Sequence, residues 1–278
     1  MKYFLNFLLL LLAVGCSSSA KRDIDSEATK APIEFYSPEY TSVQSLRAHI
    51  KLKKKVEKWI AYFTTDLKER FEDYLSNGEQ YRDMVEEILK EHQIPPELYY
   101  LPVIESGYVL HARSHMGAGG AWQFMPSTGR NYGLAYDRYL DERKNIYKAT
   151  QAAAAHLRDL YNIFGSWPLA LASYNAGVNR ITGIIIKGSN REYWKLSEMN
   201  LLPKETSEYI PKFLAAVTIG KNPEKYGLKI DRDRPKYLSD FARVSVPNRI
   251  SLRKLAKTVG IPFKELKKLN LEYRRNYV

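Results

Sequence analysis

The sequence predicts a mainly α-helical protein, and two observations carry that prediction. Apolar residues recur every three or four positions over several long stretches between residues 45 and 220, the spacing that lines one face of a helix. No alternating run of comparable strength, the pattern of a half-buried strand, occurs before residue 240. The chain has 278 residues, of which 45% are hydrophobic and 27% charged, so it is a globular protein with material for one large core or two small ones.

The first 16 residues have the plan of an export signal. A basic start is followed by an apolar run over residues 4–14, which is too short to span a membrane, and then by small residues. Cys16, the only cysteine of the chain, resembles the lipidated cysteine of a bacterial lipobox. Ser17 and Ser18 follow it, which by the same resemblance favours a lipid anchor in the outer membrane, with the protein on its periplasmic face. An ordinary signal peptide with an incidental cysteine is the alternative.

Export and charge together limit the partners. The formal net charge of +12 indicates a polyanionic or carboxylate-rich partner, such as nucleic acid, an anionic membrane or a cell-wall polymer. Export argues against nucleic acid. A single cysteine leaves no internal disulfide and no thiolate metal site. Residues 17–44 are polar, small and aperiodic, so we expect them to form a flexible tether.

Helices are expected throughout residues 45–235, the segment predicted to form the main domain. Their predicted ranges are 46–76, 81–89, 98–104, 146–164, 167–174 and 205–220. Pro96 and Pro168 are compatible with first helical turns, whereas Pro211 is expected to break the last helix. The third helix is short and apolar, and it delivers Glu105 at its C-terminal end.

The tail, residues 240–278, differs in composition from the rest. Residues 241–246 alternate like a short strand, and two helical segments follow at 251–260 and 262–270. Residues 249–278 hold nine Lys or Arg and two Glu, so their net charge of +7 is more than half of the total +12. The chain ends before a clear second strand.

Glu105 is the candidate for acid catalysis. Cleavage of a glycosidic bond needs a carboxylic acid that a desolvating pocket keeps protonated near neutral pH. Glu105 follows an apolar helix, and Trp122, Phe124 and Met125 lie in a loop able to fold over it. A lone Glu at a helix end is more often structural or solvated, so the surrounding pattern has to decide.

The loop behind Glu105 has the composition of a ligand-facing wall. Residues 117–121 are small, with no strand before them and no Lys-Ser/Thr after them, which excludes a phosphate loop. Gln123 offers a donor and an acceptor for sugar hydroxyl and N-acetyl groups, and Met125 offers an adaptable apolar surface. The alternative is that this loop plugs the core. Tyr174 and Asn175 lie at a helix end closed by glycine, where they could face a cleft as well as cap the helix.

Other polar residues are weaker candidates, and no metal or cofactor is expected. Four histidines lack metal-ligand spacing, which favours exposed or hydrogen-bonded side chains: His92, His111, His115 and His156. Asp137, Asp141 and Glu142 are the acids nearest in sequence to the loop. One of them could be a second catalytic carboxylate, but a salt bridge with Arg138 or Arg143 is favoured.

Several separated motifs, in order, resemble the lytic transglycosylase domain of the soluble-lytic-transglycosylase type. They are Glu105-Ser106, residues 117–126, and the SYNAG run at 173–177, within a wider pattern over residues 45–225. The resemblance implies a lysozyme-like helical fold that cleaves the bond between N-acetylmuramic acid and N-acetylglucosamine in peptidoglycan. It implies that Glu105 is the catalytic acid. The substrate-binding residues that it implies are Ser106, Gln123, Met125, Tyr174, Asn175 and Tyr209.

The reaction of that family explains why one carboxylate can suffice. Glu105 would protonate the glycosidic oxygen and then accept the proton of the muramic acid C6 hydroxyl, which closes a 1,6-anhydro ring without water. Such substrate assistance is an exception to the two-carboxylate rule. A lysozyme-type hydrolase and a non-catalytic peptidoglycan-binding lipoprotein are the alternatives, and a monomer is expected in each case.

The tail resembles a LysM module, a small unit that binds N-acetylglucosamine polymers, in its strand and two helices. Pro247-Asn248-Arg249 replaces the usual Gly-Asp before the first helix, so we expect a degenerate or truncated module. Three roles are open for this tail: it binds glycan, it is attracted to peptide carboxylates, or it packs on the main domain.

Overall fold

The computed structural model describes residues 43–236, 245–246 and 249–278, with side chains from residue 53 onward. The predicted export signal, the Cys16 anchor and nearly all of the tether lie outside the described residues, as does most of the strand predicted at 241–246. None of the helices in the described part is both long enough and apolar enough to cross a membrane.

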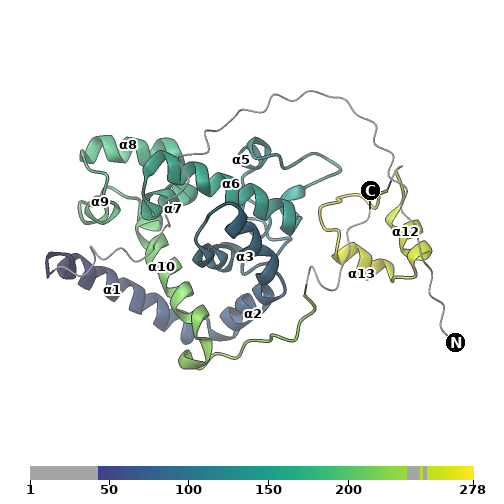
Figure 1. Cartoon of the computed structure of the whole chain (residues 1–278), viewed down its shortest axis with the longest axis horizontal. Helices are drawn as coiled ribbons and strands as arrows, with labels where there is room; N and C mark the ends of the chain where they lie inside the picture. Colours follow the sequence, from purple (N-terminus) through teal and green to yellow (C-terminus); the bar gives the residue numbers. More distant parts are fainter. Residues whose placement is uncertain (1–42, 237–244, 247–248) are drawn as a thin grey trace. The chain divides into compact units, whose positions relative to one another are not determined.

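The described chain is mainly helical, as predicted (Figure 1). Its β-structure is confined, within the described residues, to isolated bridges. The α-helices of the main body are α1 Val43–Thr64, α2 Lys68–Glu79, α3 Arg82–Glu91, α4 Leu101–Ser106, α5 Pro126–Asn131, α6 Ile146–Phe164, α7 Trp167–Ala176, α8 Val178–Gly188, α9 Tyr193–Glu198 and α10 Lys204–Lys221. The 3-10 turns are η2 Pro96–Tyr100, η3 Glu142–Lys144 and η4 Pro223–Tyr226, and the tail holds α12 Leu252–Val259 and α13 Phe263–Lys268.

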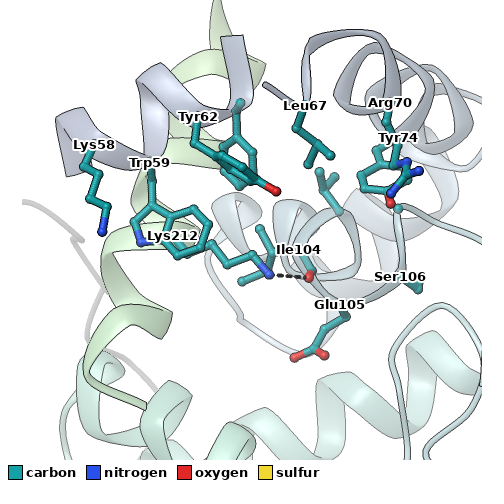
Figure 2. Close-up of a pocket in the computed structure, with 13 residues that line it drawn as sticks. Lys58, Trp59, Tyr62, Leu67, Arg70, Tyr74, Ile104, Glu105, Ser106 and Lys212 are labelled. Atoms are coloured by element: carbon teal, nitrogen blue, oxygen red, sulfur yellow. Dashed lines mark hydrogen bonds between the residues drawn. The ribbon is translucent and has the colours of Figure 1, made fainter. Parts of the chain in front are cut away.

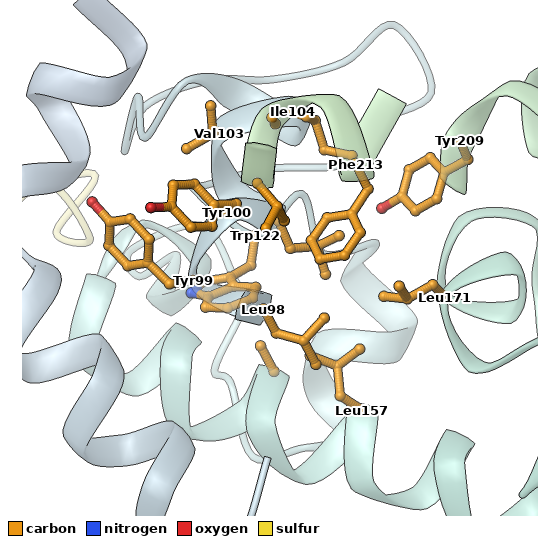
Figure 3. Packing of buried hydrophobic residues seen from close by; sticks show 14 of the residues in the cluster. Leu98, Tyr99, Tyr100, Val103, Ile104, Trp122, Leu157, Leu171, Tyr209 and Phe213 are labelled. Carbon is orange, nitrogen blue, oxygen red and sulfur yellow. The ribbon is translucent and has the colours of Figure 1, made fainter. Parts of the chain in front are cut away.

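One core runs through the main body, and α10 is central to it. This helix packs against both α1 and α7, and α6 packs against α7 (Figure 1). Figure 3 shows Leu98, Trp122 and Phe213 among the side chains that meet there, and all three are essentially inaccessible to solvent. The Trp122 indole donates a hydrogen bond to Thr150 Oγ1 over 2.9 Å, so its one polar atom is satisfied inside the core. The core-plug alternative is therefore correct for Trp122.

The long first helix predicted from residue 46 to residue 76 is wrong, because the chain forms two helices there. α1 ends at Thr64 and α2 begins at Lys68. Phe63 and Phe71 stack with ring centroids 4.2 Å apart and an interplanar angle of 7°. Both helices bury an aromatic residue at this stack. The helical spacing of apolar residues therefore continues from α1 into α2, although the chain bends between them.

The expected break at Pro211 is also wrong, because α10 continues through it. Proline lacks the N–H that would bond the carbonyl four residues earlier. Lys55 of α1 supplies a donor instead, from its Nζ to Ser207 O over 3.4 Å. Contact with α1 thus satisfies an acceptor that the helix itself leaves open.

The two helices of the tail were predicted correctly, and the end of the chain adds a feature that the sequence did not indicate. The amide of Val278 donates to Ile250 O over 3.0 Å, and the amide of Ile250 donates to Val278 O. Ser251 and Tyr277 form an antiparallel bridge. The last residues therefore pair with residues 250 and 251 through an isolated bridge, and the described part of the tail contains no regular strand.

Candidate functional site

Glu105 lies in the last turn of α4, and the helix ends at Gly107, whose backbone is in the left-handed conformation. Gly107 has φ of 63°, and a Cβ there would come within 2.0 Å of the Tyr74 ring. The residues before Glu105 in α4 are buried, which fixes the direction of the helix, whereas the Glu105 side chain is partly exposed. The hydroxyl of Tyr209, on α10, donates a hydrogen bond to its Oε1. Two of the predicted site residues, 104 positions apart, are thus in direct contact.

The carboxyl group of Glu105 is poised to act as an acid. Burial raises its pKa above the ordinary value, while the Tyr209 hydrogen bond and the nearby Lys212 ammonium act in the opposite direction without cancelling the effect. Burial disfavours the charged form of a carboxyl group, so the proton is retained to higher pH. This is the property that a general acid for glycosidic cleavage needs.

Lys212 belongs to this site, and the sequence reasoning missed it. Its Nζ donates to Ile104 O over 3.0 Å, and burial lowers the pKa of its ammonium group while the charge of Glu105 opposes that change. Lys212 follows Tyr209 by three residues on α10, and residues at that spacing share a helix face. That spacing was the signal available in the sequence.

The end of α7 is tied to both the loop and α10. Tyr174 donates from its hydroxyl to Trp122 O over 2.6 Å, and burial raises the pKa of this phenol with a further contribution from Glu105. The side chain of Asn175 accepts a hydrogen bond from Thr206 Oγ1 at 2.9 Å and donates to Glu205 Oε1 at 3.3 Å. Tyr174 is therefore close enough to Glu105 to feel its charge, whereas the hydrogen bonds of Asn175 go to α10 and hold the end of α7 against that helix.

The other three predicted residues, Ser106, Gln123 and Met125, make no hydrogen bond to the Glu105 carboxyl group in the described part of the chain. Ser106 Oγ donates to Ala121 O over 2.8 Å and so joins α4 to the loop. Gln123 donates its side-chain amide to Gly120 O over 2.8 Å, and Met125 is 39% exposed.

Arg143 holds the small-residue loop in place. Its guanidinium donates to Gly117 O at 2.8 Å and to Phe124 O at 2.9 Å, the two ends of the loop. Gly120 has φ of 81°, and a Cβ there would lie 1.7 Å from Arg143 O. Only glycine fits that position, which is why the loop can close over η3.

The three acids considered as a second carboxylate all have structural partners. Asp141 pairs with Arg143 at 2.8 Å and with Arg274 at 3.2 Å, which confirms the favoured salt bridge for this residue. Glu142 accepts from the amide of Ala135 at 2.8 Å and pairs with Lys148. Asp137 accepts the amides of the two residues at 139 and 140, at 2.6 and 2.8 Å. For Glu142 and Asp137 the partners are thus not the predicted arginines.

The histidines do not form a site. His111 and His115 are exposed, and the ring of His92 is hydrogen-bonded to Gln151 at 2.8 Å, as expected. His156 is the exception, because its buried Nδ1 has no hydrogen-bond partner within the described chain. Burial lowers the pKa of His156 to about 4, so the ring is neutral where it packs 5.4 Å from the Tyr174 ring. No group of acids, histidines or cysteines in the described residues is arranged to hold a metal ion.

A pocket of about 450 Å³ opens beside Glu105. Figure 2 shows Trp59 and Tyr62 of α1 on one side of it, Arg70 of α2 on another, and Glu105 at its edge. Lys212 and Ile104 also line the pocket, and Figure 2 shows the hydrogen bond between them as a dashed line. A ligand in this pocket would therefore lie next to the acid.

Two family models and a curated relative match parts of this chain. The model of the transglycosylase SLT domain matches residues 84–197, and the model of the LysM-like domain of lytic transglycosylase MltD matches residues 240–278. The chain is 36% identical over 204 residues to membrane-bound lytic murein transglycosylase D of Escherichia coli (strain K12). That alignment covers 71% of this chain and 44% of the relative, so the chain spans less than half of the relative's length.

Two solved structures of lytic transglycosylases are also similar. The 70 kDa soluble lytic transglycosylase of Escherichia coli has 19% sequence identity and a TM-score of 0.47, covering 72% of this chain and 32% of that one. An inactive variant of lytic transglycosylase Slt from Pseudomonas aeruginosa has 22% identity and a TM-score of 0.45, covering 58% and 27%. From the sequence matches, residues 84–197 belong to the transglycosylase SLT domain family, and residues 240–278 belong to the family of MltD LysM-like domains.

Proposed function

We propose that this protein is a peptidoglycan lytic transglycosylase with a lysozyme-like domain over residues 45–235. It cleaves the β-1,4 bond between N-acetylmuramic acid and N-acetylglucosamine and leaves 1,6-anhydro ends. The observation that carries the proposal is the carboxyl group of Glu105, whose pKa is raised by burial and which accepts a hydrogen bond from the Tyr209 hydroxyl, within a segment that matches the SLT domain. A positioned acid of raised pKa can protonate a leaving oxygen at neutral pH.

The reaction proceeds in two proton transfers that use the same carboxyl group. Glu105 donates its proton to the glycosidic oxygen as the bond from that oxygen to C1 of the muramic residue breaks, and the substrate's N-acetyl group supports the positive charge at C1. The Glu105 carboxylate then takes the proton of the C6 hydroxyl while that oxygen bonds to C1. The acid is regenerated, and no water is consumed.

The surrounding side chains have supporting roles in this proposal. Tyr209 donates a hydrogen bond to the carboxylate, which stabilises it between the two steps. Tyr174, Asn175, Gln123 and Met125 bind the glycan, and Ser106 keeps the acid and the loop in register through Ala121 O. No cofactor takes part in any of these steps.

A lysozyme-type hydrolase is the main rival, and the acids argue against it. Hydrolysis with inversion or through a covalent adduct needs a second carboxylate. Asp141, Glu142 and Asp137 are each occupied by arginine, lysine or backbone amide partners. A non-catalytic peptidoglycan-binding lipoprotein is the other rival, and an assay of murein cleavage separates it from the enzyme.

Mass spectrometry of digested murein tests the proposal. The purified protein should release muropeptides with 1,6-anhydro ends, which are lighter by one water than hydrolytic products. Products with reducing ends and no anhydro form would establish the hydrolase, and binding to sacculi without any release would establish the lipoprotein.

The location is part of the proposal. Cys16 carries a lipid that anchors the protein to the periplasmic face of the outer membrane, as a monomer, and residues 17–44 tether the domain to it. The relative's name, membrane-bound lytic murein transglycosylase D, supports a membrane location. Cys16→Ala should prevent incorporation of labelled fatty acid and release the protein from the outer-membrane fraction.

The tail over residues 240–278 packs on the main domain in this proposal. Asn145 donates to Glu272 Oε1 over 2.8 Å, and Arg274 pairs with Asp141. Arg249 also lies over the Tyr139 ring, 5.9 Å from its centroid. Glycan binding by the same module would have to use the parts of the tail that these contacts leave exposed. Sacculus binding by the chain with residues 240–278 deleted tests whether the module adds affinity.

A further inference from the structure

The pocket beside Glu105 has one wall that the glycan reaction does not use. α1 supplies this wall through Trp59 and Tyr62, and Tyr62 is 41% exposed. Val103 and Ile104, just before the acid, line the inner side. The pocket is therefore largely apolar inside and open toward the catalytic carboxyl group, the usual character of a ligand site.

The aromatic wall is held rigidly in place. The Trp59 indole donates to Glu208 Oε2 over 3.0 Å, and Glu208 also pairs with Lys55 at 3.0 Å. Tyr62 packs edge to face on Trp59, with centroids 5.6 Å apart and an interplanar angle of 87°. A wall that is already ordered loses little conformational freedom when a ligand binds, which favours binding.

The charges around the pocket select for an acidic ligand. Three cations line it, Lys58, Arg70 and Lys212, and Glu105 is the single acid among its lining residues. Neither Lys58 nor Arg70 forms a salt bridge within the described part of the chain, and both are exposed. An exposed arginine such as Arg70, on another side of the pocket from the aromatic wall, can bind a carboxylate through two parallel hydrogen bonds.

We propose that this pocket binds the acidic stem peptide carried by the muramic residue at the cleavage point. The inference rests on the proposed function, because only a muramic sugar bears a peptide on the same ring whose C1 faces Glu105. The peptide leaves that ring through the lactyl group at C3, so it has to run beside the acid. Its carboxylates meet Lys58 and Arg70, and its aliphatic parts lie on Trp59 and Tyr62. The enzyme thereby prefers peptide-bearing strands.

Paired substrates test this assignment. One is intact murein, and the other is the same glycan freed of its peptides by an amidase. The double variant Lys58→Ala/Arg70→Ala should lower kcat/KM on intact murein about 10-fold, as expected for the loss of one or two charge-assisted hydrogen bonds. On bare strands the change should stay below about 2-fold, because the stem-peptide carboxylates are gone and each muramic residue keeps only the lactyl carboxylate next to its ring.

A matched control separates the pocket from general charge effects. Lys90→Ala/Lys225→Ala removes the same two charges from exposed positions outside the pocket, and it should behave as wild type on both substrates. An equal loss of kcat/KM on both substrates in the Lys58/Arg70 variant would assign the pocket to a sugar instead. Unchanged kcat/KM on both would leave it without a role in substrate binding, and either result overturns the inference.

If the protein is not a lytic transglycosylase, the same assay gives a result that differs from failure of the peptide pocket alone. In that case the wild-type protein would release no anhydro-ended products from either substrate, which overturns both ideas together. If anhydro products form but the variant shows no preference change, the reaction stands and the peptide pocket alone is wrong.

Discussion

Asp141 and Arg143 form a salt bridge of 2.8 Å in which both side chains are almost fully buried, at 3% and 2% exposure. The same guanidinium holds both ends of the loop that carries Gln123. A buried charge that loses its partner is strongly destabilising. The pair therefore links the stability of the domain to the shape of the proposed glycan site.

Asp141→Ala should lower the free energy of unfolding by about 3–5 kcal/mol, because it leaves the Arg143 charge buried and unpaired. Urea unfolding followed by circular dichroism measures the loss. Arg274→Ala is the control, since Arg274 is a 30% exposed partner of the same carboxylate, and the expected loss is at most about 1 kcal/mol. Equal losses in the two variants would contradict the prediction.

Gly120→Ala should be far more damaging than Gly117→Ala, although both glycines have φ above 80°. A Cβ at Gly120 would lie 1.7 Å from Arg143 O, whereas one at Gly117 would meet nothing within 4 Å. The backbone strain of about 1–2 kcal/mol is common to both, and the collision adds about 2 kcal/mol or more at Gly120 alone. Thermal denaturation of the two variants compares them, and similar melting temperatures would show that the loop can move aside.

Glu105→Gln should abolish release of anhydro muropeptides and leave folding and sacculus binding intact. The amide keeps the shape of the side chain but has no acidic proton to donate. The native state holds the proton of Glu105 more tightly than the unfolded chain, since burial raises the pKa. Stability of the wild type therefore falls as pH rises from the unfolded pKa through the raised one. The variant lacks that loss, so near neutral pH it should be at least as stable. Cleavage at the wild-type rate would disprove the assignment.

Tyr209→Phe should move the alkaline limb of the kcat/KM profile to higher pH. The Tyr209 hydroxyl lowers the pKa of Glu105 by bonding the ionised form, so removing it leaves the burial effect less opposed and the acid protonated for longer. The maximum rate should fall at the same time, because the carboxylate formed in the first step loses a donor.

Lys212→Met gives an independent check of that sign. The Lys212 ammonium also lowers the pKa of Glu105, so its loss should move the limb in the same direction. A shift to lower pH in either variant would mean that the group responsible for the limb is not Glu105.

Much of the candidate site could be proposed from the sequence because its signals are local. Glu105 follows an apolar helix that ends in glycine, and the small-residue loop, Gln123 and the SYNAG run can be found without knowledge of contacts. The contact between Tyr209 and Glu105 spans 104 positions, and only the family resemblance indicated it. Lys212 was missed because the chain elsewhere carries many lysines with no special environment.

The errors in the fold have one physical origin, which is that side-chain contacts formed on folding override the local sequence rules. Apolar spacing continued past Thr64, but the stack of Phe63 on Phe71 favours a bend. Pro211 should have ended a helix, but Lys55 of α1 supplies the donor that the carbonyl of Ser207 lacks. Trp122 was expected to cover the acid, but a hydrogen bond to Thr150 makes the core a suitable place for the indole.

By itself, the sequence determined the helical class of this protein, the position of its acid at the end of a short apolar helix, and the family of its central domain. These follow from periodicity, helix-ending residues and motifs, all of which act over a few residues. The tertiary structure alone decided that the pKa of Glu105 is raised, that Asp141 is paired with Arg143, and that α1 contributes aromatic and cationic side chains to a pocket beside the acid. Burial, charge pairing and the enclosure of a pocket each depend on residues that are separated in the sequence. These properties therefore exist only once the chain has folded.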